Sequence, residues 1–366
     1  MPLTNEEISR YQRHLSLAGF GPQAQERLKA GSVLVVGAGG LGCPALLYLA
    51  AAGVGRIVIV DPDSVDASNL QRQVLYAAAD QGRGKAEAAA GRLAALNPLI
   101  RVEALPVRLD RSNAIALVGS CDVVVDGSDN FETRYLVNDA CVIAGRPFVY
   151  GAIQGFEGQV SVFNWRGGPT YRCLFPEPPP PGMAPNCAEA GVLGAVTGLV
   201  GAAQACEAIK LLTGVGEPLS GRLLVWNTLS MTSTVLALAR DPDGRRITEL
   251  PPEGYGADAC AAAPAPEEIS PEGLRRMLGS GGRVQLLDVR EAWERALGSI
   301  EPSEHVPLGR LVAGDAPEIS GLDPALPTVA YCAAGARSLH AARLLRERHG
   351  FRAASSLRGG MRGWSP

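Results

Sequence analysis

The chain has 366 residues, of which 46% are hydrophobic and 19% are charged, so it can bury a sizeable core and is not a disordered chain. The formal net charge is only −3, and no block of basic residues indicates nucleic-acid binding. This length predicts two or three domains, because one domain usually takes roughly 100–200 residues.

The chain begins with an acidic segment, Thr4 to Glu7, and no apolar segment typical of a secretory signal follows, so we expect a cytoplasmic protein. The long uncharged stretches 30–55 and 190–206 are rich in glycine or broken by Pro44, which predicts buried segments and no membrane span. Eight scattered cysteines without a CxxC pair indicate buried or catalytic thiols, not a disulfide framework.

Strands and helices alternate in the first part of the chain. Helical pieces are expected over 5–30, before the first strand. Buried strands are then expected at 32–37, 56–61, 101–109 and 122–126, and helices at about 42–52, 84–96 and 131–144. This order predicts an α/β fold with a doubly wound, mostly parallel Rossmann-like sheet.

The pattern changes after Pro147. Alternating residues at 148–163 and 222–238 predict antiparallel strands that extend or cover the parallel core, with a helix at 192–212 between them. A stretch rich in Gly, Ala and Pro then precedes a second αβ pattern. We therefore expect a first domain, a linker and a small α/β domain, with the boundaries 1–252, 253–266 and 267–366.

A glycine motif follows the first strand. Gly37, Gly39 and Gly42 form GxGxxG, with Gly40 inside it, and such glycines let backbone N–H groups approach a phosphate. Asp61 ends the next strand, where a carboxylate can hold a ribose hydroxyl. Alone, this pattern favours a dinucleotide-dependent dehydrogenase, and short glycine motifs also occur without a ligand.

Polar residues nearby argue against hydride transfer. Asn69, Arg72 and Lys85 lie where they can converge on a triphosphate, although Arg72 and Lys85 singly also suit a solvated face. Asp129 lies just past the fourth strand, at the sheet edge where α/β ligands bind, and its carboxylate suits Mg²⁺. Nucleotidyl transfer needs most of these groups, because charge builds up on the phosphoryl oxygens.

Five ordered motifs run through this part of the chain: RYQRHL (10–15), GAGGLG (37–42), VDPDSVDASNLQRQ (60–73), GKAEAA (84–89) and DGSDNFETRYLVND (126–139). From about residue 3 to residue 250 the chain resembles the ubiquitin-activating-like enzymes of bacteria, above all the molybdopterin-synthase and thiamine-thiocarboxylate adenylyltransferases. The resemblance implies a homodimer in which Arg13 reaches the partner's ATP site. It also implies phosphate contacts for Asn69, Arg72 and Lys85, ribose binding by Asp61 and Mg²⁺ binding by Asp129.

The implied reaction is attack by the Gly-Gly carboxylate of a small ubiquitin-like sulfur-carrier protein on the α-phosphate of ATP. Pyrophosphate leaves, and an acyl-adenylate remains for a sulfur nucleophile. Lys85, Arg72 and Arg13 would stabilise the developing charge. The first expectation for the carrier is the small subunit of molybdopterin synthase, and the carriers of thiamine, cysteine or tRNA-thiolation pathways are alternatives.

Two cysteine features bear on the family resemblance: one departs from the family pattern, and the other is shared with only some relatives. Relatives often bind zinc through two CxxC pairs, but here the first pair reads TYRC (170–173) and the second is replaced by ARDPDGRR (239–246). A closed zinc site needs four ligands, so we expect no zinc and a vestigial or buried Cys173. Cys187 matches a cysteine that some relatives link covalently to the carrier, and a purely structural role for it is equally open.

The last hundred residues carry a second motif. Cys332 begins the loop CAAGARS between a strand and a helix, where converging N–H groups favour a thiolate and stabilise a persulfide anion. Together with DVRE (288–291) and LRGGMRGW (357–364), this loop resembles that of rhodaneses, over about 269–364. Its uncharged alanines favour a persulfide donor protein, such as a cysteine desulfurase, over thiosulfate. Asp288 and Arg290 are expected to be a structural pair that supports the loop and not catalysts.

The leading hypothesis is therefore an ATP-dependent carrier adenylyltransferase that delivers sulfur through a Cys332 persulfide, with Cys187 as a further catalytic candidate. The linker would raise the effective concentration of one site at the other. Two alternatives stay open: a dehydrogenase with an appended domain, and a non-catalytic protein that gathers a carrier and its sulfur donor. No nucleic-acid or membrane partner is expected.

Overall fold

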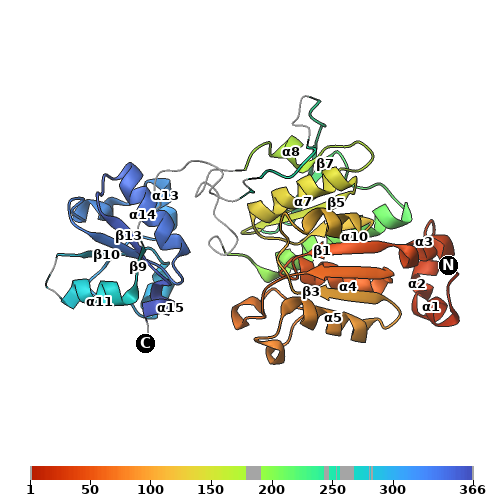
Figure 1. Ribbon diagram of the computed structural model, residues 1–366, viewed down its shortest axis with the longest axis horizontal. Coiled ribbons are helices and arrows are strands. Elements are labelled where there is room, and N and C mark those ends of the chain that lie inside the picture. The colour runs from red at the N-terminus through yellow and green to blue at the C-terminus, as the bar shows by residue number, and fades with distance from the viewer. Residues whose placement is uncertain are drawn as a thin grey trace. The chain divides into compact units, whose positions relative to one another are not determined.

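A computed structural model describes residues 2–178, 191–242, 247–252, 254–255, 268–279, 281 and 283–364. The chain divides into two compact units, Met1–Cys260 (the larger unit) and Ala261–Pro366 (the smaller unit). Each unit has its own sheet (Figure 1).

The larger unit is built on an eight-stranded sheet with the strand order β3-β2-β1-β4-β5-β6-β7-β8. Five strands run parallel: β1 (Ser32–Val36), β2 (Arg56–Val60), β3 (Arg101–Leu105), β4 (Val123–Asp126) and β5 (Phe148–Gln154). Three antiparallel strands extend them: β6 (Glu157–Phe163), β7 (Arg222–Asn227) and β8 (Thr232–Ala237). The predicted mostly parallel sheet with an antiparallel extension is confirmed.

The central strands are runs of β-branched residues that are buried on both faces, as parallel strands between helix layers require. On β1, Val33 and Val35 face one hydrophobic cluster, whereas Leu34 and Val36 face the other. The first cluster includes residues of α3 (Gly21–Ala30), α4 (Gly42–Ala52), α5 (Lys85–Leu96) and α10 (Gly194–Thr213). The second includes residues of α6 (Ala114–Gly119) and α7 (Phe131–Ala144).

Short elements complete the larger unit: α1 (Asn5–Arg10), α2 (Gln12–Leu15), α8 (Tyr171–Leu174) and the 3₁₀ turns η1 (Ala67–Asn69) and η2 (Ala78–Asp80). Within the described residues, α10 alone is long and apolar enough to cross a membrane by length and composition. Half of that stretch is buried, and it packs against α4, β5 and β6. These are the contacts of a core helix.

The third strand is shorter than the predicted 101–109. It ends at Leu105 because Pro106 has no N–H to continue the ladder, and the chain turns there, with Val107 N donating to Leu105 O.

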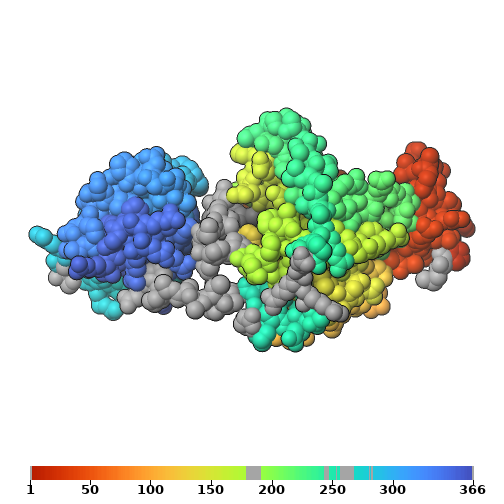
Figure 2. All heavy atoms as spheres, turned by 90° about the horizontal axis from the view of Figure 1, so that it is seen from above, coloured from red at the N-terminus to blue at the C-terminus, as the bar shows by residue number. Residues whose placement is uncertain are grey.

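At the other end of the sheet, every residue of the edge strand β8 is exposed. Figure 2 shows the green-to-teal part of the chain that contains this strand on the surface of the larger unit.

The register of the central strands brings three chain segments together. Val36 of β1 is paired with Val60 of β2 on one side and with Asp126 of β4 on the other. The residues that follow, Gly37, Asp61 and Gly127, therefore leave the sheet at one level, at its carboxyl edge. Ligands of doubly wound α/β proteins bind at this edge.

The smaller unit has a five-stranded parallel sheet in the order β11-β10-β12-β13-β9. Its strands are β9 (Glu268–Ile269), β10 (Gln285–Asp288), β11 (Glu304–His305), β12 (Thr328–Tyr331) and β13 (Ala354–Leu357). Its helices are α11 (Pro271–Gly279), α12 (Ala292–Ala296), α13 (Leu308–Ala313), α14 (Ala336–Arg348) and α15 (Gly360–Trp364), with the 3₁₀ turn η4 (Pro317–Gly321). The predicted second α/β fold is confirmed.

Candidate functional site

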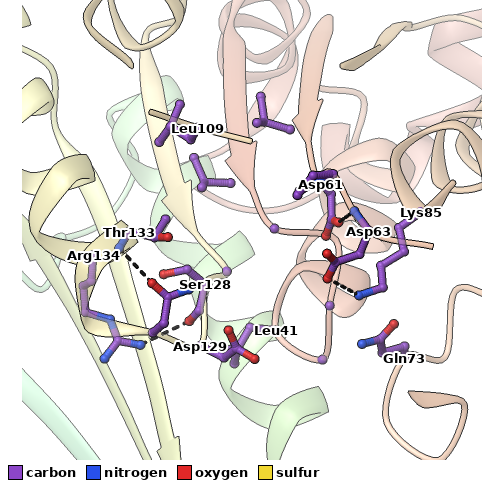
Figure 3. A pocket seen from close by; sticks show the side chains of 18 of the residues that line it. Leu41, Asp61, Asp63, Gln73, Lys85, Leu109, Ser128, Asp129, Thr133 and Arg134 are labelled. Carbon is purple, nitrogen blue, oxygen red and sulfur yellow. Dashed lines mark hydrogen bonds and ion pairs between the residues drawn. The ribbon is translucent and has the colours of Figure 1, made fainter. Parts of the chain in front are cut away.

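A cavity of about 490 Å³ lies at the carboxyl edge of β1, β2 and β4 (Figure 3). Its volume falls in the range of pockets for cofactors and small ligands. Seven of the predicted site residues line it: Gly37, Gly39, Gly40, Asp61, Arg72, Lys85 and Asp129. The cavity therefore joins residues from four separate sequence motifs.

The glycine loop needs glycine because backbone segments meet there. Gly37 has φ of +89°, and a Cβ on it would lie 2.9 Å from the carbonyl oxygen of Gly127. A Cβ on Gly42 would lie 1.9 Å from the carbonyl oxygen of Gly37. Gly42 does not line the cavity, so it serves the close packing of the turn against α4.

The Asp61 carboxylate holds this loop from the neighbouring strand. Its Oδ2 accepts a hydrogen bond from Ala38 N at 2.7 Å, and its Oδ1 accepts one from Asp63 N at 2.9 Å. Burial raises the pKa of Asp61, against the lowering effect of these two donors. Asp61 thus lines the cavity and orders the glycine loop at the same time.

Two cations approach the cavity from the same side. Lys85, the first residue of α5, is only 6% exposed, and its Nζ donates to Asp63 Oδ2 at 2.9 Å. Asp63, which lies beside Lys85 in Figure 3, is itself exposed. Arg72 is half-buried, and its Nη1 donates to Ser68 O at 3.2 Å. A buried ammonium with one exposed carboxylate partner is well placed to bind an entering phosphate.

Asp129 lies on the other side of the cavity, in the loop between β4 and α7. The preceding turn is fixed by Asp126, whose Oδ1 accepts from both N and Oγ of Ser128, at 3.0 and 2.6 Å. Asn130 caps α7 by accepting from Thr133 N at 2.8 Å. This arrangement leaves the exposed Asp129 carboxylate at the cavity wall.

The chemistry of the cavity fits Mg²⁺ that arrives with a nucleotide. The described part of the chain contains no cluster of three His, Cys, Asp or Glu side chains that would hold a metal by itself. Mg²⁺ is commonly bound by one or two carboxylates together with substrate phosphates and water. Asp129 would supply such a carboxylate.

Several further side chains line the cavity and were not predicted, among them Gln73 and Arg134. Gln73 is 3% exposed, and its Oε1 has no hydrogen-bond partner. Arg134 is buried, with Nη2 donating to Ser128 O at 3.1 Å and with Nε 3.4 Å from Asp126 Oδ2. Gln73 lies in the motif at 60–73, and Arg134 lies in the motif at 126–139. Arg134 also lies one helical turn after the Asn130 cap, and this spacing was the signal that could have predicted it.

Not every predicted site residue reaches the cavity. Asn69 ends η1 and does not line it, although its carbonyl oxygen accepts from Arg72 N and Gln73 N and so shapes the turn that carries them. Arg13 is exposed on α2, away from the cavity of its own chain. Cys187 and Cys260 lie outside the described residues.

Cys173 marks the place of the expected but incomplete zinc motif. Its Sγ accepts from Thr170 N at 3.3 Å and from Asp241 N at 3.4 Å. The sulfur thereby joins the start of α8 to the segment after β8. The absence of zinc stays a prediction.

The Cys332 loop of the smaller unit follows β12 directly. Cys332 is buried, and its Sγ accepts from Gly335 N at 3.1 Å and from Ser338 Oγ at 3.5 Å. The start of α15 supports the loop from behind, because Met361 N donates to Cys332 O at 2.7 Å. A Cβ on Gly360 would lie 2.2 Å from this same oxygen, so the second glycine of the pair in LRGGMRGW is a packing requirement.

Asp288 and Arg290 do not contact the sulfur. Their side chains are paired through two contacts, at 2.9 and 2.7 Å, and Arg290 also donates to the carbonyl oxygens of Glu294 and Gly298. The pair is structural, but its described contacts hold α12 and not the Cys332 loop that it was expected to support.

Comparisons with known proteins match both units. The sequence pattern of the ThiF family matches residues 11–246, and that of the rhodanese-like domain matches residues 270–366. "Probable adenylyltransferase/sulfurtransferase MoeZ" of Mycobacterium tuberculosis is 47% identical over 372 residues, which cover 99% of this chain and 94% of that protein.

Two further relatives cover different shares of the chain. "Sulfur carrier protein adenylyltransferase" of Thermus thermophilus is 55% identical over 247 residues, 66% of this chain and 91% of that protein. "Adenylyltransferase and sulfurtransferase MOCS3" of Mus musculus is 46% identical over 339 residues, 88% of this chain and 74% of that protein. Among solved structures, MccB of E. coli has a TM-score of 0.59 at 23% identity, over 68% of this chain and 73% of that chain, which supports the fold alone.

Proposed function

This chain belongs to the ThiF family and carries a C-terminal rhodanese-like domain, and from this premise we propose that it adenylates a sulfur-carrier protein and then supplies it with sulfur. The chain is a nucleotidyltransferase with a sulfurtransferase domain, like the relatives named above. One observation carries the adenylation proposal: the cavity that joins the glycine loop, Arg72, Lys85 and Asp129 at one sheet edge.

In the proposed first step, an oxygen of the carrier's C-terminal glycine carboxylate attacks the α-phosphorus of ATP. The new P–O bond gives an acyl-adenylate, and the bond to the β-phosphate breaks, so that pyrophosphate leaves. Backbone N–H groups of the glycine loop would bind phosphate oxygens, and Asp61 would hold the ribose. Lys85 and Arg72 would stabilise the charge that builds up on the phosphoryl oxygens.

Mg²⁺ would be held by Asp129 and by the phosphates, and it would neutralise part of the phosphate charge. Arg134 would act from the back of the cavity, where it fixes the loop that carries Asp129 through the Ser128 carbonyl. In a homodimer, Arg13 of one subunit would complete the ATP site of its partner.

In the proposed second step, the Cys332 thiolate attacks the outer sulfur of a donor persulfide, and the donor leaves as a thiolate. The terminal sulfur of the Cys332 persulfide then attacks the acyl-adenylate carbon, and AMP leaves. A second thiol cleaves the resulting acyl disulfide: the carrier leaves as a thiocarboxylate, and a disulfide forms on Cys332. Cys187 is the candidate for that thiol. Two external thiols then reduce the disulfide, restore both cysteines and leave as a disulfide of their own.

The remaining expectations complete the proposal. The donor would be a persulfide-bearing protein such as a cysteine desulfurase, and the enzyme would work in the cytoplasm. The carrier would be of the molybdopterin-synthase small-subunit type, with thiamine, cysteine and tRNA-thiolation carriers as alternatives.

The deciding experiment is carrier-dependent exchange of pyrophosphate into ATP, with a panel of purified carriers that end in Gly-Gly. We expect exchange with one carrier, and its loss in Asp129→Asn, while Glu217→Gln, an exposed carboxylate remote from the cavity, stays active. If folded protein shows no exchange with any carrier of the panel, adenylation is refuted. That result would favour a non-catalytic protein that gathers a carrier and its sulfur donor.

A further inference from the structure

Arg337 is the second residue of α14, directly after the Cys332 loop, and a carboxylate from another element holds its side chain. Both Nη atoms of Arg337 donate to Glu294, at 2.7 Å to Oε2 and at 2.6 Å to Oε1. The two side chains are 17% and 12% exposed, so the pair is largely shielded from water. A two-point contact between guanidinium and carboxylate is the strong form of this ion pair.

Glu294 is fixed in place independently of Arg337. It is the third residue of α12, and its Oε2 also accepts from Glu291 N at 2.9 Å in a capping box. Arg290 holds the helix, donating to the carbonyl oxygens of Glu294 at 3.1 Å and of Gly298 at 2.7 Å. The carboxylate is therefore presented to the loop by a braced helix.

Arg337 is the one charged side chain between Cys332 and Ser338. Its hydrogen bond with Glu294 raises the pKa of Arg337, and the Cys332 charge adds to this effect. The same bond lowers the pKa of Glu294, so the pair stays ionised at neutral pH. With Arg337 paired to Glu294, the described hydrogen-bond donors to the Cys332 sulfur are neutral, namely the Gly335 N–H and the Ser338 hydroxyl.

We propose that Glu294 is a specificity-determining residue of the sulfur-transfer site. By occupying Arg337, Glu294 disfavours small dianionic sulfur donors such as thiosulfate and leaves the site suited to a cysteine persulfide. This inference rests on the proposed sulfurtransferase function of Cys332. It adds Glu294, on α12, as the residue that sets the choice of sulfur donor.

Both donors would load Cys332 by balanced displacements. With a persulfide, the thiolate attacks the outer sulfur, the S–S bond breaks and a thiol leaves. With thiosulfate, the thiolate attacks the sulfane sulfur and sulfite leaves, so a dianion enters and a dianion departs. Cyanide then removes the sulfur as thiocyanate in either case, which provides one readout for both donors.

The test uses the full chain and measures thiocyanate formation from thiosulfate, a dianion, and from the persulfide of N-acetylcysteine amide, which carries at most one negative charge. Glu294→Gln keeps the size of the side chain and an oxygen for the cap but removes the charge. We expect kcat/KM for thiosulfate to rise about tenfold, mainly through KM, because one partly screened charge at short range supplies an effect of this order. The persulfide reaction should change less than threefold, roughly the scatter of a neutral substitution.

Matched variants identify the cause. In Glu294→Gln combined with Arg337→Ala, the gain should disappear, because no cation is left to release. Ala334→Lys adds a cation at an exposed loop position and should raise thiosulfate use without touching the ion pair. Carrier-dependent pyrophosphate exchange should stay at the wild-type level in all three.

The outcomes distinguish the sulfurtransferase function of Cys332 from the specificity role of Glu294. Wild-type protein that takes sulfur from neither donor would refute the sulfurtransferase function, and the inference with it. Wild-type protein that uses the persulfide, with no thiosulfate gain in Glu294→Gln or Ala334→Lys, would overturn the role of Glu294 alone. An equal fall with both donors in Glu294→Gln, together with no gain in Ala334→Lys, would reduce Glu294 to a structural residue.

Discussion

Single glycines determine whether the strand ends around the cavity can approach each other. Gly42→Ala would place a Cβ 1.9 Å from a backbone oxygen, and this contact cannot relax through a side chain. We expect a loss of roughly 3 kcal/mol in unfolding free energy, at the upper end for an overpacked site, measured by urea denaturation. Gly91→Ala is the matched control, because α5 is open there and the added methyl should stabilise by up to about 1 kcal/mol. Equal effects of the two changes would contradict the packing argument.

Gln73 offers a test of a residue that sequence reasoning missed. Its buried Oε1 has no partner, so Gln73→Leu should change the unfolding free energy by less than about 1 kcal/mol. If the amide binds ATP, pyrophosphate exchange should fall about tenfold, through a higher KM for ATP. The exposed Gln23→Leu on α3 serves as the control. Unchanged exchange in Gln73→Leu would remove Gln73 from the site.

The charged residues of the cavity could be predicted from their residue type better than the neutral ones could. Asp61 and Asp129 follow strands, Lys85 opens a helix and Arg72 lies in a polar turn motif, and chemistry alone suggests these residues. Gln73 could not be distinguished from a surface amide, because its burial depends on the turn after η1. The pairing of Glu294 with Arg337 joins residues 43 positions apart, and no local pattern encodes it.

At the scale of elements, a buried network joins three pieces of the larger unit. Asp139 of α7 accepts from Nε and Nη2 of Arg172 on α8, both at 2.9 Å, and from Tyr255 Oη at 2.8 Å. Asp139→Asn should cost about 3 kcal/mol, because it leaves the Arg172 charge buried, and Tyr255→Phe about 1 kcal/mol. Calorimetry of the larger unit's transition measures both. Similar, small losses for the two variants would show that the ion pair is unimportant.

Strands and helices were predictable where their patterns were strong. Runs such as SVLVV and RIVIV are short, rich in β-branched residues and buried after their first residue, and they form β1 and β2. The predicted strand at 101–109 failed at its end, since Pro106 stops the ladder after Leu105. The order of strands in the sheet was beyond the sequence, because pairing depends on long-range packing.

At the scale of the whole molecule, each unit has its own sheet and its own hydrophobic clusters. We therefore expect residues 1–260 to fold alone and to keep carrier-dependent pyrophosphate exchange within about threefold of the full chain, while losing sulfur transfer. Full-length Cys332→Ser is the control that removes sulfur transfer without removing the unit. Unfolded protein from residues 1–260, by circular dichroism, would contradict the independence of the units.

The common register of β1, β2 and β4 also determines where the chain can be engineered. Five-residue strands separate the two edges of the sheet by about 16 Å, so a change at the amino edge lies far from the cavity. Gly145 lies at that edge, between α7 and β5, exposed and with open space around it. A peptide tag or fluorophore inserted there would report on the larger unit during turnover, whereas an insertion after Val36, Val60 or Asp126 would displace the site itself.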